Sequence, residues 1–204
     1  MKERPEKVGD ITVKEKLKYL GVTIVDKRNC FKLHKDEIIS KARKMANLTQ
    51  NVVGKSCNRM LIGKTFWKSV ALPSILYGAN IVDFNRQDLE KLQRIENSVS
   101  RKILNAPNYG QESALRGEIG MSSMRGRIME GQLKYLQYIL RGESNKLLER
   151  VIEEMRMEKK KSKWISDMME NRKLIGIKGE NVSNNEISEK VKKWDTHEWK
   201  KRAL

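Results

Sequence analysis

Residues 85–107, NRQDLEKLQRIENSVSRKILNAP, decide the fold class of this chain. Apolar side chains recur here every three or four positions, as they do on one face of an α-helix. They are Leu89, Leu92, Ile95, Val99, Ile103 and Leu104. Asn85 stands where an N-cap is needed, Asp88 would lie in the first turn, and Pro107 closes the helix. The stretch therefore predicts an amphipathic helix with defined ends.

The residues before this helix predict further helices. An apolar period of three to four recurs over residues 36–54, with Gly54 as the stop signal, and again over residues 56–71. Pro73 breaks or restarts the second of these helices. Residues 74–82 are apolar nearly all round, which predicts a central, buried helix.

A small β-hairpin is predicted nearer the amino terminus. Residues 17–25 are rich in β-branched side chains, which favour an extended strand. A polar turn at residues 26–29 separates them from residues 30–33, which we interpret as the return strand. Residues 1–16 are charged and predict an irregular lead-in.

The residues after the central helix continue the helical pattern. Residues 112–119 predict a short helix ended by Gly120, and Ser122 or Ser123 can cap the next one. Further helices are expected from Ser144, around Trp164, and near the carboxyl end. The predicted organisation is a lead-in at 1–16, a hairpin at 17–34, a helical domain at 35–157 and a basic helical extension at 158–204. The predicted fold class is mainly α, a helical bundle with a small amino-terminal β-hairpin.

The chain carries a large excess of positive charge. Lys and Arg number 43 against 26 Asp and Glu, which gives a formal net charge of +17. Such a surface attracts polyanions, and binding to a phosphate backbone would weaken steeply with salt. Charge alone does not distinguish RNA from DNA, or either of them from an anionic membrane.

Several absences in the sequence favour an intracellular protein, nuclear or cytoplasmic and not secreted. The longest uncharged run, residues 69–82, is too short to span a membrane, and the amino terminus lacks the apolar stretch of a secretory signal. Cys30 and Cys57 form neither a Cys-x-x-Cys pair nor a disulfide framework. We therefore expect no membrane partner.

Four stretches resemble the thumb of non-LTR (LINE-type) retrotransposon reverse transcriptases. The first is residues 18–22, KYLGV, which resembles the strand at the palm-to-thumb junction known as the primer grip. The second combines His34 with Ile38, Lys41 and Ala42, and the third is residues 67–78, WKSVALPSILYG. The fourth is the helix at 85–107 with the turn that follows at 120–127. The similarity spans residues 14–138 and implies a helical thumb that grips nucleic acid.

The sequence departs from an active polymerase of this family. Reverse transcription needs carboxylates that hold two metal ions at the transferred phosphate, and the chain contains no Asp-Asp pair. The resemblance implies that both ligand sets lie upstream of the KYLGV strand, with two magnesium ions in the complete enzyme. We therefore predict no catalytic residue, no metal site and no cofactor in this chain, and no activity for this chain alone.

Candidate nucleic-acid-binding residues come from the hairpin and the first two helices of the predicted helical domain. They are Tyr19, Leu20, Gly21, His34, Lys41, Arg43, Lys44, Lys55, Arg59, Lys64 and Lys68. The first three could position a primer end or form an ordinary strand, and His34 could touch a phosphate or hold the structure together. The basic side chains could face a template–primer duplex, or they could be a solvated helix surface.

Two functions fit this sequence. The leading hypothesis is a fragment of an RNA-directed DNA polymerase whose partners are RNA or an RNA–DNA hybrid and the missing fingers and palm. The alternative is a non-enzymatic, basic helical module derived from a retroelement that binds nucleic acid or protein. The oligomeric state stays open.

Overall fold

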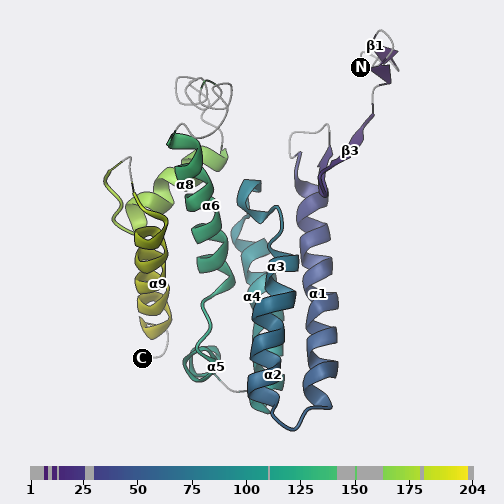
Figure 1. Ribbon diagram of the computed structural model, residues 1–204, viewed down its shortest axis with the longest axis vertical. Helices are drawn as coiled ribbons and strands as arrows, with labels where there is room; N and C mark the ends of the chain where they lie inside the picture. Colours follow the sequence, from purple (N-terminus) through teal and green to yellow (C-terminus); the bar gives the residue numbers. More distant parts are fainter. Residues whose placement is uncertain are drawn as a thin grey trace.

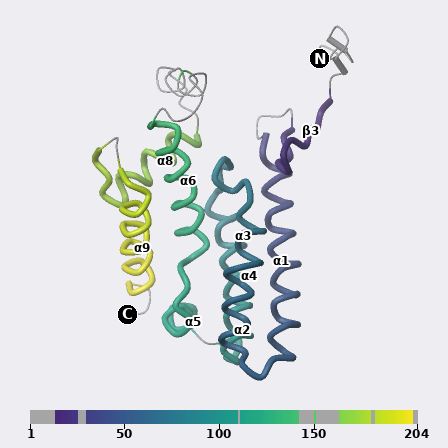
Figure 2. Tube along the Cα trace, in the orientation of Figure 1, coloured from purple at the N-terminus to yellow at the C-terminus, as the bar shows by residue number. Residues whose placement is uncertain are grey.

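A computed structural model shows that the fold is mainly helical, with a small antiparallel β-hairpin near the amino terminus, as predicted. It describes residues 7–8, 11–12, 14–25, 30–109, 111–141, 150, 163–179 and 182–201. In Figure 1, the first long helix stands at one edge of the molecule and the last helix at the opposite edge. The other helices lie between them, and the chain path is followed most easily in Figure 2.

The helical segments follow one another along the whole described chain. They are α1 (Lys32–Gly54), α2 (Arg59–Phe66), the π-helix η1 (Trp67–Ala71), α3 (Leu72–Ile75), the 3₁₀ helix η2 (Ala79–Ile81), α4 (Arg86–Leu104), α5 (Glu112–Ile119), α6 (Met124–Leu140), α8 (Lys163–Leu174) and α9 (Asn184–Lys201). The strands are β1 (Lys7–Val8), β2 (Ile11–Thr12), β3 (Lys16–Tyr19) and β4 (Val22–Val25).

The hairpin is shorter than the sequence suggested. Strands β3 and β4 pair in antiparallel register through a loop of only two residues, Leu20 and Gly21. Both have positive φ, 45° and 82°, which is the backbone of the tightest hairpin turn and suits glycine at the second position. The predicted return strand at residues 30–33 is therefore wrong, because β4 already pairs with β3 and α1 begins at Lys32. Strands β1 and β2 also form a small pair inside the predicted irregular lead-in.

The predicted helices at 56–71 and 74–82 are divided differently in the structure. A π-helix joins α2 to α3, and it places Trp67 in the core with 1% of its surface exposed while Val70 faces solvent. The predicted buried helix at 74–82 is wrong, because α3 ends at Ile75 and Gly78 adopts a φ of 73°. A Cβ atom at Gly78 would lie 2.8 Å from Nε2 of His34, so only glycine fits this turn.

Capping side chains set the ends of the later helices where the sequence predicted them. The Asn85 side-chain oxygen accepts a hydrogen bond from the Asp88 amide at 2.8 Å, which starts α4. Ser123 does the same for α6 through the Gly126 amide at 2.9 Å. Gly120 ends α5 with a φ of 61°. Helix α4 ends in a left-handed Asn105, before Pro107 is reached.

Two apolar cores hold the described helices together, and α6 contributes to both. The first core joins α1, η1, α3, α4 and the beginning of α6. The second joins the rest of α6 to α8, α9 and the loop between them, where Ile177 and Val182 are buried. The predicted helix from Ser144 and the boundary between residues 157 and 158 lie outside the described residues. Over the described ranges, the structure contains no helix that is both long and apolar enough to span a membrane.

Gly63 is where α2 approaches the first core most closely, and we expect Gly63→Ala to destabilise the fold. A Cβ atom there would lie 2.6 Å from Val53 Cγ2 and 2.7 Å from Ile103 Cγ1, and both side chains are buried. Overpacking of this kind costs about 1–3 kcal/mol, partly offset by the better helix propensity of alanine. Urea denaturation measures the loss. Gly54→Ala is the matched control, because no atom lies within 4 Å of its Cβ position, and an equal loss there would contradict the packing argument.

Candidate nucleic-acid interface

The basic residues predicted to bind nucleic acid lie in a part of the chain that has no acidic residue. Residues 38–82, which we call the acid-free segment, contain seven Lys and Arg and no Asp or Glu. This segment forms most of α1 and all of α2, η1, α3 and η2. Helix α1 packs against α2, η1 and α3, so the segment is continuous in space as well as in sequence.

Most of the seven cations have no partner in the part of the chain that the structure describes. Lys41 Nζ donates to the Ser74 carbonyl oxygen at 3.1 Å, and Arg59 donates to the Asn105 side-chain oxygen at 2.9 Å. The other five make no hydrogen bond or ion pair with another described residue. They are Arg43, Lys44, Lys55, Lys64 and Lys68. A surface of unpaired cations suits a phosphate backbone.

The structure separates the cations of α1 into two flanks. Lys41 reaches α3 through Ser74, and helical spacing places Lys44 and Lys55 on the same flank, three and fourteen residues later. Arg43 lies seven residues before Gln50, whose side chain contacts α4 through Ser98. Seven residues are about two helical turns, so Arg43 faces the α4 side. Lys44 and Lys55, the residue that caps α1, therefore lie nearer to Lys41 than to Arg43 around the helix, on the side away from its buried residues.

Lys64 and Lys68 lie one helical turn apart, where α2 passes into η1. The pKa of the Lys68 ammonium is held below its ordinary value by partial burial first, and then by the positive charges of Lys64 and Arg127. Arg127 comes from the first turn of α6, and it is not among the binding residues predicted from the sequence. The smaller, repulsive effects of Lys64 and Arg127 on this pKa indicate that three cations from three elements lie near one another.

The hairpin residues form a separate, exposed group. Tyr19, Leu20 and Gly21 are all exposed at the tip of the β3–β4 hairpin, at the amino-terminal end of α1 (Figure 1). The Tyr77 hydroxyl donates to the Leu20 carbonyl oxygen at 2.8 Å, so the hairpin tip is anchored to the residues that follow α3. The tip therefore lies beside the end of the acid-free segment, while α2 lies beside the other end of α1.

His34 is buried, with 4% of its surface exposed, so it does not present a nitrogen to solvent. Its Nδ1 accepts from the Thr23 amide at 3.4 Å and lies 3.6 Å from Glu37. Its Nε2 faces Gly78. These contacts join β4, α1 and the turn after α3, which favours the structural interpretation of His34 over contact with a phosphate.

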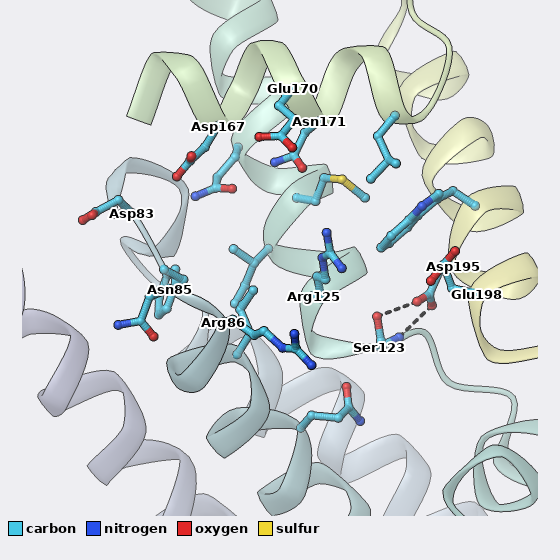
Figure 3. Close-up of a pocket in the computed structure, with 18 of the residues that line it drawn as sticks. Asp83, Asn85, Arg86, Ser123, Arg125, Asp167, Glu170, Asn171, Asp195 and Glu198 are labelled. Carbon is cyan, nitrogen blue, oxygen red and sulfur yellow. Dashed lines mark hydrogen bonds between the residues drawn. The ribbon is translucent and has the colours of Figure 1, made fainter. Parts of the chain in front are cut away.

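The opposite side of the molecule contains a cleft of about 930 Å³ lined by carboxylates and cations (Figure 3). Helix α6 lines it together with α4 on one side and α8 and α9 on the other. Burial raises the pKa of the Asp167 carboxyl, and the charges of Asp83 and Glu170 raise it further against the effect of Lys163. Figure 3 shows Asp167 and Glu170 on α8 and Glu198 on α9. Cations also line the cleft, namely Arg86, Arg116, Arg125 and Lys163. It is therefore of mixed charge, unlike the acid-free segment.

The docking of α9 on α6 should depend on pH through Glu130. Burial acts to raise the pKa of the Glu130 carboxyl, but hydrogen bonds from Lys134 at 2.6 Å and Ser188 at 2.7 Å outweigh it and hold the pKa below its ordinary value. A lowered pKa in the folded state stabilises the fold above the ordinary Glu value of about 4.3, and this stability is lost as the pH falls through the folded pKa. We therefore expect Glu130→Gln to cost stability at pH 7 but progressively less toward pH 3 in urea denaturation. Glu189→Gln, an exposed α9 change, should show no such trend, and a pH-independent loss at Glu130 would contradict the assignment.

Among the residues that the structure describes, no three His, Cys, Asp or Glu side chains come together as metal ligands do. No known protein family, curated protein or solved structure matches this chain.

Proposed function

We propose that this chain grips the backbone of an RNA–DNA hybrid through the acid-free segment, as the thumb of an RNA-directed DNA polymerase. The observation that carries the proposal is that residues 38–82 contain seven cations and no carboxylate. Five of these cations have no partner among the described residues. Contacts from Lys and Arg to phosphate fix a duplex in position without reading its sequence.

Helix α1 gives the acid-free segment a straight edge. Its residues 38–54 make a helix of roughly 25 Å, which is shorter than one turn of a nucleic-acid double helix. The acid-free segment runs down α1 and returns through α2 and α3 to the hairpin tip. A duplex laid along it would meet cations near Lys44 and again near Lys55, where α1 ends and the chain turns into α2.

The polymerase context rests on the family resemblance. Two of the resembling stretches, residues 18–22 and 67–78, contact each other through Tyr77 and Leu20, which supports their interpretation as one unit. In this proposal the chain alone performs no phosphoryl transfer, and the catalytic carboxylates and magnesium ions belong to the fingers and palm of a larger enzyme. The proposed site of action is inside the cell, in the nucleus or the cytoplasm.

A titration of the full chain against a labelled 20-base-pair RNA–DNA hybrid, followed by fluorescence anisotropy at several salt concentrations, tests this proposal. We expect the logarithm of the association constant to fall linearly with the logarithm of the salt concentration. The slope should be roughly −3 to −5 if four or five phosphates are contacted. Absent or salt-insensitive binding would overturn the proposal. Equal affinity for hybrid and for double-stranded DNA would favour the non-enzymatic nucleic-acid-binding module over the polymerase thumb.

A further inference from the structure

Two cations of the acid-free segment lie near a third cation from outside it. Lys64 and Lys68 lie one turn apart on α2 and η1, while Arg127 approaches from α6. Lys64 Nζ lies 3.5 Å from the position that a Cβ atom on Gly120 would occupy, so it reaches the corner between α5 and α6. The three side chains therefore bridge two separate parts of the fold.

A buried carboxylate fixes the position of Arg127. Glu96 is 2% exposed, and its Oε1 accepts hydrogen bonds from both Trp67 Nε1, at 3.2 Å, and Arg127 Nη1. Because Trp67 directly precedes Lys68 in η1, this shared acceptor holds the Arg127 guanidinium beside η1. The Arg127 side chain is only 14% exposed. It is thus a rigid donor, whereas Lys64 and Lys68 are flexible cations at the rim.

We infer that Lys64, Lys68 and Arg127 form a clamp for one phosphate of the nucleic-acid backbone, an inference that rests on the proposed function. A fixed guanidinium with two mobile ammonium groups offers several charge-assisted hydrogen bonds to the two free oxygens of a phosphodiester. Glu96 already balances the charge of Arg127, so the charge that an entering anion would neutralise is mainly that of Lys64 and Lys68. A duplex held by the clamp would pass from α2 toward the corner between α5 and α6.

Inorganic pyrophosphate is a suitable probe of the clamp in the full chain. In amide NMR spectra of the isotope-labelled protein, we expect saturable shifts at Lys68, Gly120 and Arg127, and smaller, non-saturating shifts at Lys44 and Lys55. The double variant Lys64→Ala/Lys68→Ala should lose the saturable response. Uniform shifts across all these lysines, or none at the clamp, would overturn the inference.

The affinities of single and double variants for the RNA–DNA hybrid test the clamp separately from the proposed function. Because Lys64 and Lys68 share one phosphate, their single alanine variants should each lose roughly tenfold in affinity, and the double variant should lose less than the product. Lys44→Ala and Lys68→Ala should combine additively, because they contact different phosphates. Additivity at Lys64 and Lys68 would overturn the clamp while hybrid binding itself still supports the proposed function.

Anionic vesicles test the competing source of phosphate, since Leu61 on α2 is also exposed. In sedimentation with phosphatidylglycerol vesicles, we expect the Lys64→Ala/Lys68→Ala variant and a Lys44→Ala/Lys55→Ala variant to bind the vesicles equally well. A selective loss of vesicle binding by the first variant, with hybrid binding unchanged, would overturn the assignment to nucleic acid. Unchanged urea midpoints in both variants confirm that they are folded.

Discussion

Replacing Glu96 with alanine is expected to destabilise the fold by about 3 kcal/mol, a larger loss than Gly63→Ala should cause. Glu96 lies in α4 and accepts hydrogen bonds from both Trp67 Nε1 and the Arg127 guanidinium. Gln93 also donates to its second oxygen at 3.2 Å. Without the carboxylate, a mostly buried guanidinium would lose its counter-charge, and burying an unpaired charge is costly.

Glu90→Ala is the matched control for this prediction, because it removes a carboxylate from the same helix. Glu90 forms an exposed pair with Arg86 at 2.9 Å, and exposed pairs contribute about 0–1 kcal/mol. Urea denaturation of both variants gives the comparison. Similar losses at the two positions would show that Glu96 does not hold the helices together in the way described.

Removing the unpaired lysines of the acid-free segment should have the largest effect on binding. We expect the variant with alanine at Lys44, Lys55, Lys64 and Lys68 to bind an RNA–DNA hybrid on the order of 10³-fold more weakly near 0.1 M salt. Each phosphate that the lysines neutralise releases about one condensed counterion when the complex forms. All four side chains lack a partner among the described residues, so their loss should leave the fold intact.

A second variant removes the same charge from elsewhere and controls for net charge. Lys173, Lys178, Lys192 and Lys193 are exposed residues in α8, in α9 and in the loop between them. Alanine at these four positions lowers the net charge equally but leaves the acid-free segment unchanged. We expect less than about tenfold loss of hybrid affinity from this variant. Equal losses in both variants would mean that total charge, and no particular surface, governs binding.

Local signals in the sequence predicted the parts of the fold that local chemistry determines. Asn85, Ser123 and Gly120 each cap or end a helix through contacts within a few residues, and the structure confirms α4, α5 and the start of α6. The hairpin and the segment after Pro73 were predicted less well. Their course depends on positive φ values at Leu20, Gly21 and Gly78 and, at Gly78, on packing against a residue distant in the chain.

The candidate interface also combines features that are visible in the sequence with features that depend on packing between distant residues. The absence of acidic residues from 38 to 82 is visible in the sequence and is the signal that best marks the surface. The sequence does not show that Arg43 faces α4 or that His34 is buried, because these depend on how the helices pack. Arg127 lies 59 positions after Lys68, and the shared contact with Glu96 brings it beside η1.

The salt dependence of hybrid binding by the two four-lysine variants tests the central claim most directly. If the acid-free segment grips the phosphate backbone, alanine at Lys44, Lys55, Lys64 and Lys68 should reduce the slope of log affinity against log salt by about two to three, because Lys64 and Lys68 share one phosphate. Alanine at the four lysines of α8, α9 and their loop should change that slope by less than about one. Equal slopes for both variants and the unaltered chain would contradict the proposed grip.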